Sequence, residues 1–168
     1  MSAMRSIRIE KITLNIGAGK EVTRLDKATK LLEAITGIKP VKTVAKKRLP
    51  AWGLRPGLPI GCKVTVRRKK EELLKRLLEA IEFRLKESQF DAQGNISFGI
   101  PEYINIGEMK YIPEIGVMGL QACVTLERAG FRIKRRKFAG EIGPKHRITK
   151  AEAIEYVKTF GAKMGDDK

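Results

Sequence analysis

The chain has 168 residues, of which 42% are hydrophobic, so its length and composition suit one domain with a buried core. Its 35 Lys and Arg outnumber its 19 Asp and Glu and leave a formal net charge of +16, which indicates a polyanionic partner because such an imbalance destabilises a folded protein by self-repulsion. No run approaches the ~20 consecutive apolar residues that cross a bilayer, and the first residues lack the apolar block of a signal peptide, so we expect neither membrane insertion nor export.

The first part of the chain predicts a strand followed by a helix. Residues 7–16 alternate polar and apolar side chains, and the phase of the alternation changes at Glu10, which indicates a β-bulge. Residues 23–36 follow the period of an amphipathic helix, and Thr23 with Asp26 resembles a weak capping box. The glycine that follows is expected to end this helix.

The next segment predicts a short strand and an unusual loop. Residues 41–45 are expected to be extended, and residues 49–61 hold three prolines and three glycines, which stiffen a loop and allow close backbone approach. Trp52 and Arg55 can offer an aromatic plane and a cation near the tip of this loop. Alternatively, Trp52 and Leu54 fold back into the core, and the sequence leaves both alternatives open.

Further strands and a long helix follow. Residues 60–66 alternate as a half-buried strand, and residues 71–87 form the most regular amphipathic helix of the chain. Strands are expected at 96–100 and 120–126. Residues 131–138 are expected to return beside the latter strand as the arm of a basic hairpin.

The end of the chain predicts a capped helix and a short tail. Thr149 and Glu152 form a capping box for a helix that ends at Gly161. We expect residues 1–161 to form one domain and residues 162–168 a flexible tail. Strands and helices interleave without a strict βαβ repeat, which predicts an α+β fold: a mainly antiparallel sheet with helices packed on one face, the other face free for solvent or a ligand, a protruding basic hairpin and a Pro/Gly-rich loop.

Residues that usually carry catalysis or bind metals are few. Cys62 and Cys123 stand 61 positions apart without a CxxC pattern, so we interpret both as reduced residues of the sheet. Residues 17–20 (Gly-Ala-Gly-Lys) fail the Walker pattern, although the backbone amides of this turn can still reach a phosphate. His146, the single histidine, has no nucleophile or carboxylate cluster near it in the sequence. We therefore expect that the protein is not an enzyme and that it binds no cofactor, metal or small-molecule substrate.

The cations are concentrated in two parts of the chain. Residues 39–70 contain eleven Lys and Arg and no acidic residue, and residues 128–150 contain nine against the single acid Glu141. Such segregation favours a nucleic acid over a merely solubilising surface. Because aromatic residues are few, we expect recognition of the shape and backbone of folded RNA rather than the stacking of several bases. A module that binds an acidic protein or DNA is the alternative.

Four blocks in the sequence resemble one family of proteins. The blocks are KITLNIG at 11–17, ITGIKPVKTVAKK at 35–47, RPGLPIGCKVTVR at 55–67 and GNISFGI at 94–100. In this order and spacing they resemble a universal large-subunit ribosomal protein family, called L-five in bacteria and L-eleven in eukaryotes. The chain lacks the long N-terminal helical extension of bacterial members and carries a basic segment at 145–149, so it is similar to the archaeal and eukaryotic branch.

The resemblance implies a partner and a place in the cell. Family members bind 5S ribosomal RNA with a face of the sheet and help to anchor it in the central protuberance of the large subunit, in the cytoplasm. Family RNA contacts fall on Asn15 and Thr65, whereas a glutamine of bacterial members is replaced by Ile38, so that this contact is lost or supplied differently. The loop at 49–61 corresponds to the family's extended loop, which approaches transfer RNA (tRNA) in the P site. Large-subunit rRNA and neighbouring ribosomal proteins, including a small-subunit bridge protein, are further expected partners.

Together, charge and resemblance predict three sets of contacts. For 5S rRNA we expect Asn15, Lys39, Lys42, Thr43, Lys63, Thr65 and Arg67. For the loop near tRNA we expect Lys46, Lys47, Arg48, Trp52 and Arg55. For additional rRNA contacts we expect Lys134, Arg135, Arg136, Lys137, Lys145, His146 and Arg147. The alternative to the ribosomal function is a basic RNA-binding module or RNA-processing factor outside the ribosome.

Overall fold

A five-stranded antiparallel sheet forms the centre of the protein. The computed structural model describes residues 3–107, 109–138 and 140–165. The sheet has the strand order β2-β3-β1-β6-β5, built from β1 (Ile7–Gly17), β2 (Val41–Val44), β3 (Pro59–Val66), β5 (Ile96–Ile100) and β6 (Leu120–Arg128). Two short strands, β4 (Arg84–Lys86) and β7 (Lys163–Gly165), pair in parallel, and three helices complete the fold: α1 (Val22–Thr36), α2 (Lys70–Glu79) and α3 (Lys150–Lys158). The predicted α+β class is confirmed.

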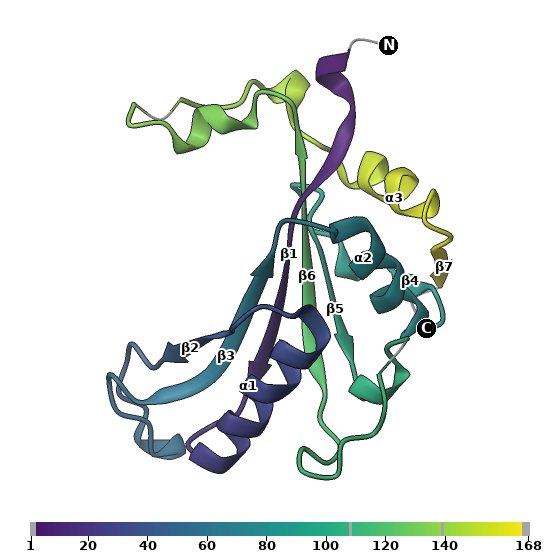
Figure 1. Ribbon diagram of the computed structural model, residues 1–168. Helices are drawn as coiled ribbons and strands as arrows, with labels where there is room; N and C mark the ends of the chain where they lie inside the picture. Colours follow the sequence, from purple (N-terminus) through teal and green to yellow (C-terminus); the bar gives the residue numbers. More distant parts are fainter. Residues whose placement is uncertain (1–2, 108, 139, 166–168) are drawn as a thin grey trace.

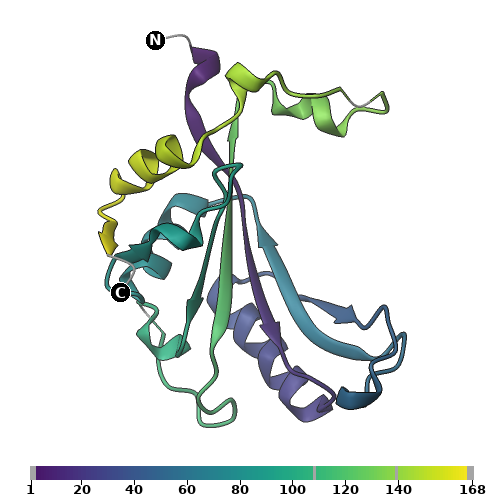
Figure 2. The same ribbon diagram turned by 180° about the vertical axis from the view of Figure 1, so that it is seen from behind.

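The two faces of the sheet differ because side chains alternate along each strand. On one face Ile12, Leu14 and Ile16 of β1 are buried, together with Val64 of β3 and Val124 of β6. Helices α1 and α2 pack on this face, as Figure 1 shows. The view from behind in Figure 2 shows the opposite face, which none of the described helices covers. The fold therefore leaves one side of the sheet available for another molecule.

Strand β1 contains the predicted bulge. Its pairing with β6 shifts register between Ile9 and Lys11, so one residue of β1 is left without an opposite partner. The shift lets Ile9 and Ile12, three residues apart, both bury their side chains in the core. The change of phase in the sequence thus has a direct structural cause.

Helix α1 begins differently from the prediction and ends as predicted. Its N-cap is Glu21, whose side chain makes no capping hydrogen bond, so the predicted capping box of Thr23 and Asp26 is wrong. Asp26 instead bonds to a lysine of β2. At the other end Gly37 adopts a φ of 66°, and its amide donates to the carbonyl of Glu33 at 2.7 Å.

Helix α2 is shorter than the predicted helix over 71–87. It ends at Glu79, after which Glu82 and Phe83 adopt positive φ angles of 54° and 58° and turn the chain into β4. Leu85 is buried in β4 rather than on the helix. No glycine or proline marks this turn, and the leucine pattern continues through it, so no local signal in the sequence indicates the end of the helix.

Residues 162–165, the first part of the predicted tail, pack against the rest of the domain. Residues 162–168 were expected to be a flexible tail, but Ala162 is buried and β7 follows it beside β4. The amide of Lys163 donates to the carbonyl of Phe83 at 2.7 Å. This hydrogen bond joins the segment to the turn between α2 and β4. Residues 166–168 lie outside the described residues.

The predicted basic hairpin over 131–138 is wrong. Gly130 turns the chain with a φ of 92°, and Phe131–Arg135 then form a 3-10 helix instead of a strand. Of residues 131–138 only Phe131 is buried, because the consecutive cations leave no apolar face for a sheet to cover. The predicted capping box before α3 is confirmed: Thr149 Oγ1 accepts from the amide of Glu152 at 3.4 Å.

Gly61 provides a test of the close contact between β1 and β3. A Cβ atom at this position would lie 2.7 Å from the carbonyl oxygen of Ile16 and 3.1 Å from Oγ1 of Thr43. We expect Gly61→Ala to lower the free energy of unfolding by about 1–3 kcal/mol, since backbone must shift to admit the methyl group. Urea denaturation measures this loss.

Gly99→Ala is the matched control on β5. A Cβ atom there meets nothing within 4 Å, so we expect the free energy of unfolding to change by less than about 0.5 kcal/mol. Equal stability of the two variants would contradict the packing of β1 against β3.

Candidate nucleic-acid interface

The face of the sheet that the helices leave uncovered carries polar side chains, and we call it the open face. In the strand register Asn15 lies opposite Lys63 on one side and Gln121 on the other, and Thr13 lies opposite Thr65 and Cys123. All of these side chains are half-buried or exposed. The open face consists of Lys11, Thr13, Asn15, Lys63, Thr65, Ser97, Gln121, Cys123 and Thr125.

The structure brings together the three central residues predicted to bind RNA. Asn15 and Lys63 are direct cross-strand neighbours, and Thr65 lies one pair further along the same two strands. The amide Nδ2 of Asn15 donates to Oε1 of Gln121 at 3.4 Å, so the open face also contains a glutamine that the sequence did not single out. The alternation of β6 was the available signal, because Gln121 stands in the polar phase between Leu120 and Ala122.

Lys42 lies on the opposite side of the sheet from these residues. In the pairing of β2 with β3 it is opposite the buried Cys62, and its Nζ lies 2.9 Å from Oδ1 of Asp26 on α1. Thr43, the next residue, is opposite Gly61 in the phase of the open face. Lys39 is exposed between α1 and β2. Lys42 therefore helps to hold α1 against the sheet. The alternation of side chains along β2 and β3 would have indicated that it lies on the side of the helices.

The Pro/Gly-rich loop separates its two large apolar residues. Trp52 is 70% exposed, whereas Leu54 is 7% exposed and pairs with Leu49 in an isolated β-bridge. The amide of Ala45 donates to the carbonyl of Leu58 at 2.8 Å and closes the base of the loop. Of the two alternatives left by the sequence, Trp52 is exposed on the loop, whereas Leu54 folds back and is buried. The predicted cations of the loop are all exposed and form no ion pair with any residue that the structure describes: Lys46, Lys47, Arg48 and Arg55.

The turn at residues 17–20 has less capacity for a phosphate than its sequence indicated. The amides of Ala18 and Gly19 both donate to the carbonyl oxygen of Ile60, at 2.9 and 3.1 Å. Because these two donors are already used, the turn serves to join the end of β1 to the start of β3.

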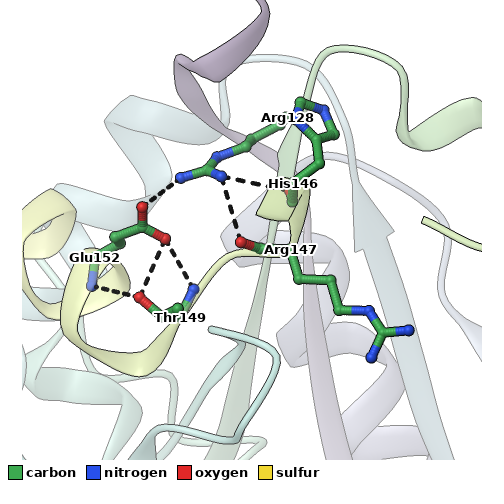
Figure 3. A network of polar contacts seen from close by, with 5 residues as sticks. All are labelled: Arg128, His146, Arg147, Thr149 and Glu152. Carbon is green, nitrogen blue, oxygen red and sulfur yellow. Dashed lines mark hydrogen bonds and ion pairs between the residues drawn. The ribbon is translucent and has the colours of Figure 1, made fainter. Parts of the chain in front are cut away.

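A buried arginine holds together the two ends of the segment 129–147, which projects from the sheet and which we call the basic protrusion (Figures 1 and 3). Arg128 is 5% exposed, and its Nη2 lies 2.6 Å from Oε1 of Glu152. Its Nη1 donates to the carbonyl oxygens of His146 and Arg147, at 3.4 and 3.3 Å. In the sequence Arg128 was only one of the nine cations counted in residues 128–150, and it was assigned no contact of its own. In the alternation of β6, Arg128 is in the same phase as the buried Val124 and Leu126, and this position indicated a structural role.

Several predicted RNA contacts of the protrusion have partners within the protein. His146 Nε2 lies 2.8 Å from the carbonyl oxygen of Ala129, and the imidazole packs edge-on against Phe131 with the ring centroids 5.7 Å apart. Arg135 forms ion pairs with Glu10 and Glu127 at the end of the sheet. Arg147 Nε donates to the carbonyl of Ile142 at 3.2 Å. The ion pairs of Arg135 fix the protrusion to the sheet, and the other contacts hold the protrusion together.

Other cations of the protrusion remain available. Arg136, Lys137 and Lys145 are exposed and pair with no acidic residue in the described part of the chain. Lys134 is also exposed, with Nζ 4.9 Å from the centre of the Phe131 ring. The structure thus divides the predicted contacts into anchoring side chains and free ones.

The protrusion and the open face together line a groove of about 730 Å³. Lys11 and Thr125 contribute from the sheet, and Lys134, Arg135 and Arg147 from the protrusion. Glu10 and Glu141 also line the groove, but each is paired with an arginine of the protrusion. The groove extends the polar surface of the open face toward the free cations.

The cysteines lie on opposite faces of the sheet. Cys62 is buried beneath α1, and this burial raises the pKa of its thiol, which therefore stays protonated near neutral pH. Cys123 is half-buried on the open face, and both thiols are free. Among the described residues no three His, Cys, Asp or Glu side chains gather in a way that could hold a metal ion. None of the helices in the same part of the chain is long and apolar enough to cross a membrane.

Comparison with known proteins decides the family. The family described as Ribosomal protein L5 matches residues 2–55, and the model for the C-terminal part of the same ribosomal family matches residues 59–156. The chain belongs to the ribosomal protein L5 family. Similar proteins named "Large ribosomal subunit protein uL5" occur in Nanoarchaeum equitans, with 52% identity over 92% of this chain and 93% of the relative, and in Sulfurisphaera tokodaii, with 47% identity over 94% and 91%. A third, from Methanococcus vannielii, is 45% identical over 96% and 92%.

Membership of the L5 family decides between the classes that the sequence left open. These relatives are archaeal, which confirms the predicted branch of the family. Members of the L5 family are structural proteins of the large ribosomal subunit, so the chain is a ribosomal protein and not an enzyme.

The clamp between Arg128 and Glu152 predicts a dependence of stability on pH. The hydrogen bond from the backbone of Thr149, aided by Arg128, lowers the pKa of the Glu152 carboxyl below its ordinary value of 4.5. A carboxylate with a lowered pKa stabilises the folded state above its ordinary pKa, and this contribution is lost as the pH falls through the lowered value. We expect Glu152→Gln, which keeps a capping side chain, to cost about 1 kcal/mol of unfolding free energy at pH 7, allowing for the partial exposure of the carboxylate.

The difference in the free energy of unfolding between Glu152→Gln and the unmodified protein is expected to shrink as the pH is lowered below 4.5. Urea denaturation at pH 7 and at successively lower pH measures it. Glu155→Gln, at an exposed position of the same helix, is the control and is expected to change nothing. A difference for Glu152→Gln that persists unchanged in acid would contradict the clamp.

Proposed function

We propose that this protein binds 5S rRNA through the open face and helps to anchor it in the central protuberance of the large subunit. The observation that carries the proposal is the placement of Asn15, Lys63 and Thr65 as neighbours on the one face of the sheet that is not covered by described helices. Asn15 and Thr65 are also the residues on which the sequence resemblance places family RNA contacts. The proposal joins this placement to membership of the ribosomal protein L5 family.

The chemistry of the open face suits a folded RNA. Its centre offers neutral hydroxyl and amide groups, which can exchange hydrogen bonds with 2′-hydroxyls and base edges, and Lys63 and Lys11 can neutralise phosphates. Arg67, exposed just beyond β3, extends the positive charge. The acids at the far end of the face do not oppose RNA, because Glu127 lies 2.9 Å from Arg8 and Glu10 pairs with Arg135. Binding combines charge neutralisation with recognition of shape.

The loop between β2 and β3 is proposed to approach tRNA in the ribosomal P site. An exposed Trp52 next to exposed cations combines a surface for stacking with groups that bind phosphate. Leu54 and the hydrogen bonds at the base of the loop hold Trp52 out from the sheet. The basic protrusion is proposed to contact large-subunit rRNA, and neighbouring ribosomal proteins complete the surroundings.

Two substitutions on the open face separate hydrogen bonding from charge. If roughly six to eight phosphates are neutralised, a plot of the logarithm of the affinity for 5S rRNA against the logarithm of the salt concentration has a slope of about −5 to −7. Thr65→Val removes a hydroxyl and keeps the volume, so we expect a loss of about 1–3 kcal/mol with an unchanged slope. Lys63→Ala is expected to weaken binding and to reduce the magnitude of the slope by about 1.

Matched controls lie on the side of the helices. Thr23→Val and Lys27→Ala change the same residue types at exposed positions of α1, and we expect both to bind 5S rRNA as the unmodified protein does, apart from a small long-range charge effect. Filter binding over a series of salt concentrations makes all of these measurements. A slope near zero for the unmodified protein, or equal losses for test and control variants, would reject the open face as the binding site.

The loop is tested by replacing its exposed side chains while leaving Leu54 in place. We expect Trp52→Ala combined with Arg55→Ala to leave the affinity for 5S rRNA unchanged. The affinity of P-site tRNA for reconstituted ribosomes is expected to fall by up to roughly 100-fold, the range for loss of one base stack. If 5S rRNA binding falls as well, the loop contributes to folding or to the 5S site, and the proposed role is rejected.

A further inference from the structure

The tip of the basic protrusion presents an aromatic ring to solvent. Phe138 is 87% exposed, the largest exposed fraction among the large hydrophobic side chains of the described residues. Phe131, at the start of the same segment, is 6% exposed and packs against the imidazole of His146. The two phenylalanines therefore have opposite environments, and only Phe131 is used to hold the protrusion together.

The surroundings of Phe138 are positively charged. Arg136 and Lys137 directly precede it, and both are exposed without an acidic partner in the described ranges. Glu141, the one acid of the protrusion, lies 3.9 Å from Arg147. A single exposed apolar residue needs no explanation by itself. An exposed ring directly preceded by two unpaired cations matches a partner that offers both a flat apolar surface and negative charge.

An unpaired nucleotide is such a partner. Its base has a face on which an aromatic ring can stack, and its flanking phosphates attract Arg and Lys side chains. An acidic protein surface would offer the charge but no comparable flat ring as a general feature. The combination of ring and cations at one tip thus favours RNA.

The protrusion is also held in place before any partner binds. Arg128, at the start of the segment, bonds to its end through the carbonyls of His146 and Arg147, and Arg135 bonds to the end of the sheet. Figure 1 shows the tip reaching away from the strands of the sheet. Because the anchors already restrict the root of the protrusion, less conformational entropy is lost when the tip is bound.

We propose that Phe138 stacks on an unpaired base of ribosomal RNA, while Arg136 and Lys137 neutralise the phosphates beside it. The proposal rests on the proposed function, since it requires the protein to bind rRNA, but it defines a second contact separate from the open face. The RNA that supplies the base is either 5S rRNA or large-subunit rRNA, and both are used as probes. Base stacking distinguishes this contact from a purely electrostatic one.

Three substitutions of Phe138 in the full-length protein test the stacking. Phe138→Ala is expected to weaken binding to the RNA that holds the base by roughly 5- to 100-fold, the range for loss of one base stack, without changing the salt slope. Phe138→Trp keeps an aromatic plane and is expected to retain the affinity. Phe138→Leu keeps an apolar side chain without the plane, so its loss is expected to approach that of alanine. Arg136→Ala, in contrast, is expected to reduce the magnitude of the slope by about 1.

Binding is measured by filter assay against 5S rRNA and, separately, large-subunit rRNA transcripts, and ultraviolet crosslinking followed by mass spectrometry is expected to join Phe138 to a nucleotide of one of them. Unchanged affinity of Phe138→Ala for both RNAs overturns the inference, and a loss for Thr65→Val in the same assay shows that the open-face proposal survives. Full affinity of Phe138→Leu also overturns the inference, since it indicates apolar docking rather than stacking. If the unmodified protein binds neither RNA, both proposals fall.

Discussion

The alternation of side chains along β1, β3 and β6 is the constraint on which the rest of the molecule depends. Each strand buries every second residue beneath α1 and α2 and turns the others to the opposite side. A shift of one residue in register would bury Lys63 and expose Val64, at a large cost in solvation. The same packing that stabilises the core therefore also fixes which polar groups stand together on the open face.

Charge serves two separate purposes in this protein. A first group of arginines supports the internal structure: Arg128 is buried against Glu152 and two carbonyls, and Arg135 joins the protrusion to the sheet. A second group, which includes Lys63, Arg136 and Lys137, stays exposed. A count of Lys and Arg therefore does not say which of these side chains can meet a polyanion. Contacts with the carbonyls of the backbone, rather than acids alone, hold the structural arginine Arg128.

Most strands could be predicted from the sequence because each carries a regular alternation, and even the bulge of β1 was visible as a change of phase. The end of α2 could not be predicted, since Glu82 and Phe83 adopt positive φ angles without a glycine to mark the turn. The resemblance singled out Asn15 and Thr65, and the pairing of β1 with β3, which the sequence analysis did not predict, makes them neighbours. The role of Arg128 was missed because a count of cations does not distinguish a buried arginine from an exposed one.

The order of the strands in the sheet has a consequence for how the chain is made. β1, the first strand to be synthesised, lies in the middle of the sheet, and its neighbour β6 begins only at Leu120. The pairing of β4 with β7 joins Arg84 to Lys163, close to the last described residue. Contacts between such distant parts of a chain form slowly because a long loop must close first. A nascent chain that ends before β6 leaves one edge of β1 without its hydrogen-bonding partner, so newly made copies depend on rapid completion of synthesis, or on a chaperone, to avoid aggregation.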